Sequence, residues 1–188
     1  MRLRENELHV ITGTSGTGKS VLLAALVECG YEGFAEPVRK TLEHQLEIDG
    51  PALPSKDADL FIRALLTQSL RDFGQAVGSK NISFFDRGLP DLIAYANRFG
   101  VESAEIVDAA KKSRYSEKVF VLSPWDEIFE PDEFRKASFA EYKNFHRLIT
   151  DAYTDMGYSL VEVPKVSITS RVDFILSALN LDSHLTCS

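Results

Sequence analysis

The fold of this chain is decided by residues 13–20, Gly13-Thr14-Ser15-Gly16-Thr17-Gly18-Lys19-Ser20, which fit the phosphate-binding pattern G-x-x-x-x-G-K-[ST] at every fixed position. An apolar run at 8–12 precedes this loop, and a continuously apolar stretch at 21–27 follows it. Strand, glycine-rich turn and helix is the order that the pattern requires. The backbone N–H groups of such a turn point at phosphate oxygens, in front of the positive end of the helix. We therefore predict a nucleotide phosphate site here.

Two side chains of the loop supply its chemistry. Lys19 is expected to reach the β- and γ-phosphates of ATP, and the Ser20 hydroxyl is a suitable ligand for Mg²⁺. The whole loop 13–20 is therefore predicted to bind the nucleotide. The alternative is a flexible glycine and serine turn without a ligand, but the flanking strand and helix patterns favour phosphate binding.

Length and charge limit the class of protein. The 188 residues are enough for one sizeable core, so we expect a single domain over 1–188. The net charge of −7 argues against a nucleic acid partner, because phosphate backbones are bound by clustered basic faces. Residues 1–7 are too polar for a signal peptide, and no apolar run is long enough to span a membrane. We expect a cytoplasmic protein without membrane contact, and no feature of the sequence decides its oligomeric state.

Strand and helix patterns alternate along the rest of the chain. Further strands are expected at 31–35, 82–85, 118–122 and 158–163. Helices are expected at about 40–47, 55–77, 89–99, 103–113, 139–156 and 169–179, and Pro37 is expected to make a turn or a helix start. This alternation predicts a three-layer α/β fold of the P-loop NTPase type, with a mostly parallel five-stranded sheet covered by helices on both faces. We expect the helical region at about 37–78 to lie on the substrate side.

Ligands of such sheets bind at the carboxyl ends of the strands, so residues that follow a strand are candidates for the site. Asp86 follows the strand 82–85, where it can hold Mg²⁺ beside Ser20. Its alternative role is to start a tight turn with Arg87 and Gly88. Arg87 either contacts the oxygens of the transferred phosphate or neutralises Asp86, and the sequence does not choose between them.

Glu36 is the more informative acid, because it follows the second strand. Its carboxylate can take the proton of an acceptor hydroxyl while the γ-phosphate lies over Lys19, although an acid before Pro37 can also be a solvated turn residue. Arg39 lies one helical turn later. It either binds an anionic group of the substrate or pairs with Glu36 or Glu43.

Residues 123–137 have the length and polarity of a lid. Arg135 is expected to move onto the phosphates when this segment closes and excludes water. Trp125 either stacks on a ring of the ligand or anchors the loop to the core.

Several stretches together resemble the small AAA-type ATPase family, which groups with the ribosylnicotinamide-kinase domain and, more distantly, with deoxynucleoside and nucleoside monophosphate kinases. The likeness extends over nearly the whole chain, and its most specific part is the pattern D-R-G-x-P-D-x-x-x-Y. The stretches that carry it are 13–20, Glu36-Pro37-Val38-Arg39, Phe85-Asp86-Arg87-Gly88-Leu89-Pro90-Asp91-Leu92-Ile93-Ala94-Tyr95 and 161–176.

The resemblance implies a role for several residues. Glu36 corresponds to the acid that related kinases use as a base, and Asp86 with Arg87 to the pair near Mg²⁺ and the phosphates. Pro164 falls in the loop beside adenine, and Arg135 in the lid. Asp91 and Tyr95 share one helix face and are expected to reach the substrate, with helix capping and packing as the alternatives. Ribosylnicotinamide kinases tend to have a tyrosine after the strand-end acid. This chain has Pro37 there, and in this respect it is more similar to deoxynucleoside kinases.

Together these observations predict a Mg-ATP-dependent kinase that transfers the γ-phosphate to a hydroxyl of a small, nucleoside-like acceptor. One alternative is an ATPase switch that acts on a protein partner and has no small-molecule acceptor. Another is a kinase of nucleic acid ends, which the acidic charge disfavours. The sequence names neither the acceptor nor a preference for ATP over GTP.

Overall fold

The computed structural model describes residues 7–79, 81–125 and 139–181. These residues form a five-stranded sheet in the order β2-β3-β1-β4-β5, and all four neighbouring pairs are parallel. The strands are β1 (Leu8–Gly13), β2 (Glu32–Phe34), β3 (Ser83–Asp86), β4 (Lys118–Leu122) and β5 (Ser159–Glu162). The predicted parallel sheet is confirmed.

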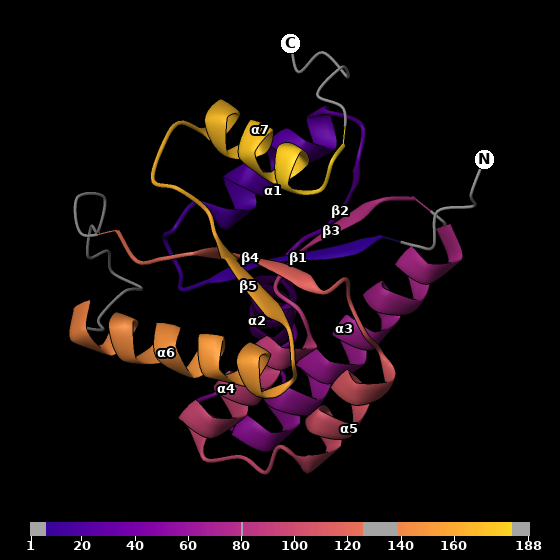
Figure 1. Ribbon diagram of the computed structural model, residues 1–188. Coiled ribbons are helices and arrows are strands. Elements are labelled where there is room, and N and C mark those ends of the chain that lie inside the picture. Colours follow the sequence, from indigo (N-terminus) through magenta and orange to yellow (C-terminus); the bar gives the residue numbers. More distant parts are fainter. Residues whose placement is uncertain (1–6, 80, 126–138, 182–188) are drawn as a thin grey trace.

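Helices cover both faces of this sheet and complete a three-layer α/β fold (Figure 1). The helices α1 and α7 lie on one face, while α3, α4, α5 and α6 lie on the other, and α2 packs against α3. Their bounds are α1 (Lys19–Glu28), α2 (Pro37–Glu47), α3 (Ala58–Ser79), α4 (Leu89–Phe99), α5 (Ala104–Lys112), α6 (Phe139–Asp155) and α7 (Ile168–Ala178).

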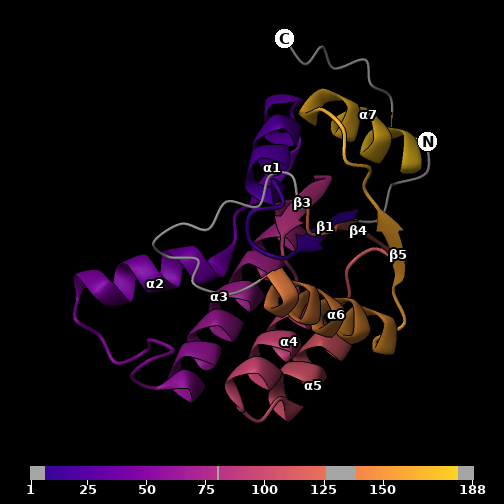
Figure 2. The ribbon, with the colours of Figure 1, turned by 90° about the vertical axis from the view of Figure 1, so that its left-hand side faces the viewer.

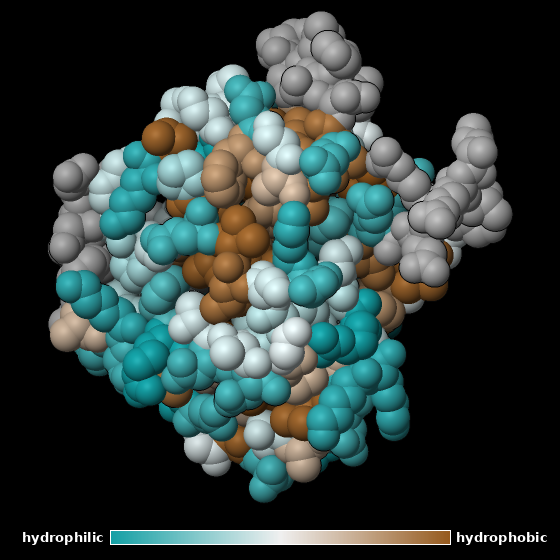
Figure 3. Space-filling model, in the orientation of Figure 1, coloured by the Kyte–Doolittle hydropathy of each residue, from teal (hydrophilic) through white to brown (hydrophobic). Residues whose placement is uncertain are grey.

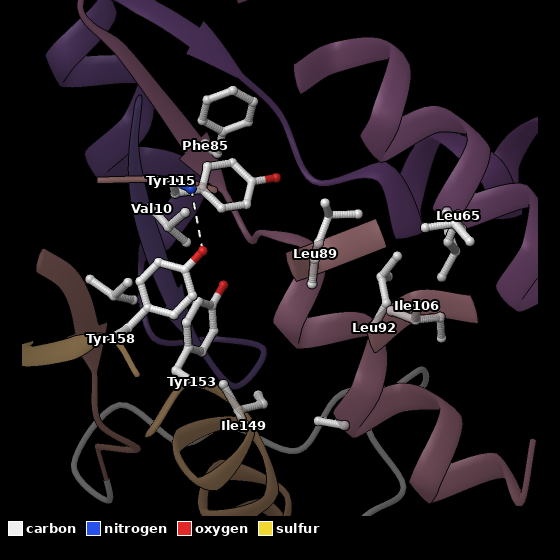
Figure 4. Packing of buried hydrophobic residues seen from close by; sticks show 14 of the residues in the cluster. Val10, Leu65, Phe85, Leu89, Leu92, Ile106, Tyr115, Ile149, Tyr153 and Tyr158 are labelled. Atoms are coloured by element: carbon white, nitrogen blue, oxygen red, sulfur yellow. Dashed lines mark hydrogen bonds between the residues drawn. The ribbon is translucent and has the colours of Figure 1, made fainter. Parts of the chain in front are cut away.

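The core consists of two hydrophobic clusters, one on each face of the sheet. Successive side chains of a strand point to opposite faces, so Val10 of β1 joins one cluster and Ile11 joins the other. Helices cover both faces, so the central strands are apolar on both sides. Figure 4 shows the cluster under α4 and α6, where the Tyr158 hydroxyl accepts a hydrogen bond from the Tyr115 N–H at 3.3 Å.

Several element boundaries differ by a few residues from the sequence expectation. Helix α2 begins at Pro37, which takes the helix-start role of the two expected for it, because proline fits the first helical turn, where its missing N–H needs no partner. Helix α3 continues through Gly78 to Ser79, since this exposed glycine costs the helix only about 1 kcal/mol. The edge strand β5 is short and mostly exposed, with Leu160 at 36% of its full exposure.

The surface in Figure 3 is mostly hydrophilic, with an apolar area near its centre where β5 runs in Figure 1. No helix among the described residues is long and apolar enough to cross a membrane.

The strand order determines where the candidate site lies. Because β1 is the central strand, the loop that follows it starts between the carboxyl ends of β3 and β4. Ile11 of β1 pairs with Asp86 at the end of β3, and the Arg87 N–H donates to the Ile11 carbonyl at 3.0 Å. The edge of the sheet that carries these ends faces the viewer in Figure 2, with α2 and α3 to one side of it.

Candidate active site

The loop 13–20 has the backbone of a phosphate cradle. Gly13, Gly16 and Gly18 have φ values of 136°, 80° and 89°, a region that residues with a Cβ rarely adopt. At Gly13 a Cβ would also collide with the Leu122 carbonyl of β4. Helix α1 begins directly after Gly18, so the loop N–H groups and the positive helix end face the same space. A buried hydroxyl in this cradle, Thr14 Oγ1, has no hydrogen-bond partner among the described residues.

Lys19 lies inside this cradle and is almost fully buried. Its Nζ donates to the Thr14 carbonyl at 2.7 Å, and the Thr17 hydroxyl donates to the same carbonyl at 3.0 Å. Burial, together with the nearby Arg87 guanidinium, lowers the pKa of Lys19 to about 8, although Asp86 and Glu36 oppose the shift. A buried amine with this pKa is held without a full counter-charge, and bound phosphate oxygens would supply one.

Ser20 and Asp86 form a pair of oxygen ligands beside Lys19. The Ser20 hydroxyl donates to Asp86 Oδ2 at 2.8 Å, while Asp86 Oδ1 is buried without a partner among the described residues. Burial raises the pKa of Asp86, and Lys19 opposes this shift. These oxygens fit Mg²⁺, which prefers oxygen ligands. The described residues hold no cluster of three acidic, His or Cys side chains, so phosphate and water oxygens would complete the coordination.

Arg87 is buried in a positive-φ conformation, with φ at 76°, which is uncommon for a residue other than glycine. Its Nε donates to Glu36 Oε1, and its Nη1 donates to the Gly13 carbonyl at 2.8 Å and to Asp91 Oδ1 at 3.1 Å. The guanidinium carbon lies 5.5 Å from the centre of the Tyr95 ring. The ion pairs of Arg87 are therefore with Glu36 and Asp91, and it links the second strand end to the P-loop.

Asp91 is fully buried and organises the start of α4. Its Oδ1 accepts from the Thr12 hydroxyl at 2.6 Å, and its Oδ2 accepts from the Gly88 N–H at 3.0 Å and from the Tyr153 hydroxyl at 2.6 Å. Both carboxylate oxygens are thus occupied by protein donors, as expected for a buried charge. Sequence reasoning named Asp91 but missed Thr12 and Tyr153, and no sequence signal marked Tyr153.

Glu36 lies at the N-terminus of α2 with 23% of its side chain exposed. Burial raises its pKa, but Arg87 and Lys19 lower it more strongly, so the net pKa is below the ordinary value and the carboxylate is ionised at neutral pH. A small open hollow, with room for about one water molecule, lies between the neighbouring residues Ala35 and Pro37 and the end of β3. Its walls are formed by Phe34, Ala35, Pro37, Ser69, Asp72, Phe85, Asp86, Arg87 and Tyr115.

The remaining predicted residues lie around this centre. Arg39 is exposed and its Nε donates to Glu43 Oε1 at 3.2 Å, which matches the ion-pair alternative. Tyr95 is half-buried between Arg87 and the rings of Phe99 and Phe145.

Pro164 follows β5, at the same edge of the sheet as the P-loop. Arg135 and most of the predicted lid lie outside the described residues.

Arg171 was not selected from the sequence, although it contacts the P-loop. Its Nη1 donates to the Thr17 carbonyl at 3.2 Å from the start of α7, and its guanidinium carbon lies 5.3 Å from the centre of the Trp125 ring. An arginine so far from the motif in sequence carries no local signal of this contact.

A phosphate cradle after β1, an acid at the end of β3 and helices on both faces of a parallel sheet define a P-loop protein with the three-layer fold of the nucleotide kinases. The family profile described as AAA domain matches residues 8–171. The chain belongs to this family.

Solved structures agree with this fold. The NadR protein in complex with NR superimposes with a TM-score of 0.73 at 14% identity, over 96% of this chain and 53% of that one. Thymidylate kinase from Ehrlichia chaffeensis gives a TM-score of 0.60 at 14% identity, over 95% of this chain and 100% of that one. The YorR protein from Bacillus subtilis, in complex with phosphorylated GDP, gives a TM-score of 0.59 at 14% identity, over 94% of this chain and 98% of that one.

This chain spans about half the length of NadR. At such identities the likeness defines the fold alone. No curated protein sequence matches the chain.

Proposed function

We propose that this protein is a Mg-ATP-dependent kinase that transfers the γ-phosphate of ATP to a hydroxyl of a small, nucleoside-like metabolite. The observation that carries the proposal is the position of Glu36. Its ionised carboxylate follows β2 with 23% of the side chain exposed, and it is paired with Arg87, whose Nη1 donates to the Gly13 carbonyl of the phosphate cradle. An ionised carboxylate that is partly exposed beside a phosphate site can take the proton of an acceptor hydroxyl, as phosphoryl transfer needs.

On the donor side, the loop 13–20 holds the phosphates and Lys19 contacts the β- and γ-oxygens. Ser20 and Asp86 hold Mg²⁺, which neutralises charge on the phosphates when it is bound. Pro164 lies beside the base of the nucleotide. We keep Arg135 in this proposal as a lid residue that contacts the phosphates on closure.

On the acceptor side, Glu36 takes the proton of the acceptor hydroxyl while the oxygen of that hydroxyl forms a bond to the γ-phosphorus. The bond from this phosphorus to the β,γ-bridging oxygen breaks, and ADP leaves. Arg87 holds Glu36 and the Gly13 carbonyl through its Nε and Nη1, and its positive charge beside the cradle would stabilise the transferred group. Asp91 acts by holding Arg87, since both of its oxygens are occupied by protein donors.

Arg39 and Tyr95 complete the acceptor side of the proposal as substrate contacts. Both lie near Glu36 in this arrangement, Arg39 on the first turn of α2 and Tyr95 beneath the Arg87 guanidinium. The nucleoside-like acceptor is part of the proposal, suggested by the names of solved structures that share the fold. They include a thymidylate kinase and a NadR protein in complex with NAD and AMP-PNP.

The test is a panel of nucleosides and cofactor precursors, scored by ADP release from Mg-ATP. We expect at least one compound to accelerate ADP release in the parent protein and none to do so in Lys19→Ala. Turnover that ignores every compound would contradict a small-molecule kinase. If such turnover instead increased with a protein partner, it would support the ATPase switch.

A further inference from the structure

Tyr153 is a fully buried side chain of α6 to which the proposed chemistry gives no role. Figure 4 shows its ring beside that of Tyr158, and the two ring centres are 5.5 Å apart. Its hydroxyl donates to Asp91 Oδ2 at 2.6 Å and accepts from the Gly88 N–H at 3.1 Å. A Cβ added to Gly88 would lie 2.9 Å from this hydroxyl oxygen. The hydroxyl therefore lies directly against the backbone that precedes α4.

The cap of α4 is complete without this hydroxyl. Asp91 is the third residue of α4, and its Oδ2 accepts from the Gly88 N–H at 3.0 Å, as in a capping box. The Tyr153 oxygen is only a second acceptor for the same N–H. The hydrogen bond that Tyr153 donates therefore acts mainly on the Asp91 carboxylate.

The buried charge of Asp91 is compensated partly by neutral donors. The Thr12 hydroxyl donates to Oδ1 and the Tyr153 hydroxyl donates to Oδ2, each at 2.6 Å. The ion-pair partner of Asp91 is Arg87, whose Nη1 donates to Oδ1 over a longer distance of 3.1 Å. Because two hydroxyl groups stabilise the carboxylate, Asp91 does not need the whole guanidinium.

The Arg87 guanidinium is shared as a result. Its Nε donates to Glu36 Oε1, and its Nη1 donates to the Gly13 carbonyl at 2.8 Å as well as to Asp91. Without the Tyr153 hydroxyl, Asp91 would lose one of its two hydroxyl donors and attract the guanidinium more strongly. The bond from Arg87 to Glu36 would then weaken.

The backbone of Arg87 depends on the same contacts. Its φ of 76° is a conformation that persists only where the surroundings fix it. The Arg87 N–H donates to the Ile11 carbonyl at 3.0 Å, and the following N–H, that of Gly88, donates to Asp91 and Tyr153. Tyr153 thus contacts both the backbone after Arg87 and the ion-pair partner of its side chain.

We propose that Tyr153 is a positioning residue of the candidate active site, which acts through Asp91 to keep the Arg87 guanidinium on Glu36 and on the Gly13 carbonyl of the phosphate cradle. This inference rests on the proposed function for its catalytic consequence, because there Glu36 is the base. The alternative against which it is tested is a purely structural role, in which the bond only joins α6 to α4.

The first experiment follows Glu36 itself and needs no substrate. Burial raises the pKa of Glu36, whereas Arg87, Lys19 and Arg39 lower it more strongly, and the Asp86 carboxylate also faces it. A weaker bond to Arg87 must therefore raise this pKa. We expect Tyr153→Phe to raise it by about half a pH unit or more, measured by carbon-13 NMR of the full chain labelled at glutamate carboxyl groups. Glu36→Gln identifies the signal.

Tyr158→Phe is the matched control, because it removes the same atom from a buried tyrosine of the same cluster. The Tyr158 hydroxyl accepts from the Tyr115 N–H at 3.3 Å, so this variant should leave the pKa of Glu36 unchanged. An unchanged pKa in Tyr153→Phe, or the same rise in both variants, would overturn the assignment. If Tyr153→Phe does not fold, Thr12→Val decides, since it removes the other hydroxyl donor to Asp91; an unchanged pKa there would equally overturn it.

The second experiment measures turnover with Mg-ATP and the compound that most accelerates ADP release. We expect Tyr153→Phe to lower kcat about 10- to 100-fold while the KM for ATP changes less than about twofold. The acid limb of its kcat profile should move to higher pH, because Glu36 must be ionised to act as the base. Equal losses in Tyr158→Phe would indicate packing alone and overturn the inference. A parent protein that transfers no phosphate would remove the kinase proposal, while the Glu36 titration would still decide the role of Tyr153.

Discussion

The low pKa of Lys19 makes proton uptake a sensitive test of the phosphate site. In the free protein burial lowers this pKa to about 8, so at about pH 9 only about a tenth of the amines are protonated. Phosphate oxygens bound next to Nζ favour the ammonium form and raise the pKa. The bound state then holds more protons than the free state, and ATP affinity must fall as the pH rises above about 8, by up to about tenfold per pH unit.

The assay is titration calorimetry of ATP binding in buffers that differ in their ionisation enthalpy. At about pH 9 we expect close to 0.9 proton to be taken up per ATP, because the phosphates of ATP have completed their own ionisation at that pH. Lys19→Arg is the matched control, since its guanidinium is protonated before binding and takes up none. Uptake near zero in the parent, or equal uptake in both proteins, would refute the reasoning.

The other predictions concern three side chains of the site. Glu36→Gln should leave Mg-ATP affinity nearly intact and slow single-turnover transfer about 10²- to 10⁴-fold, and equal transfer by mutant and parent would remove Glu36 as the base. Asp86→Asn should raise the Mg²⁺ concentration for half-maximal turnover about tenfold or more; an unchanged Mg²⁺ titration would place the metal elsewhere. Tyr153→Phe should lower the free energy of unfolding, measured by urea denaturation, by about 1–3 kcal/mol, because it removes a donor to buried Asp91. An unchanged free energy of unfolding would show that the bonds from Gly88 and Thr12 are enough to stabilise the buried Asp91 carboxylate.

The sheet could be predicted because local signals agree with the global fold. The loop 13–20 fixes a strand before it and a helix after it, and each later apolar run between turn signals became a strand. Boundaries failed where a single residue was given too much weight. Gly78 was expected to end α3, but the helix continues through it to Ser79.

The contacts within the candidate site could be predicted only where strand ends bring residues together. The expectation that ligands bind at the carboxyl ends of parallel strands placed Glu36 and Asp86 near Lys19. It could not decide the partner of Arg87, because this partner depends on rotamers and backbone conformation. The bond from Tyr153 to Asp91 joins α6 to α4, and that from Arg171 to Thr17 joins α7 to the P-loop. Such pairs depend on tertiary packing, and no spacing within the sequence reveals them.

The most direct test of the central claim is the fate of the γ-phosphate. With Mg-ATP and the compound that most accelerates ADP release, phosphorus NMR and mass spectrometry should find a phosphorylated acceptor in an amount equal to the ADP. ADP accompanied by an equal amount of inorganic phosphate, with no phosphorylated acceptor, would contradict the account.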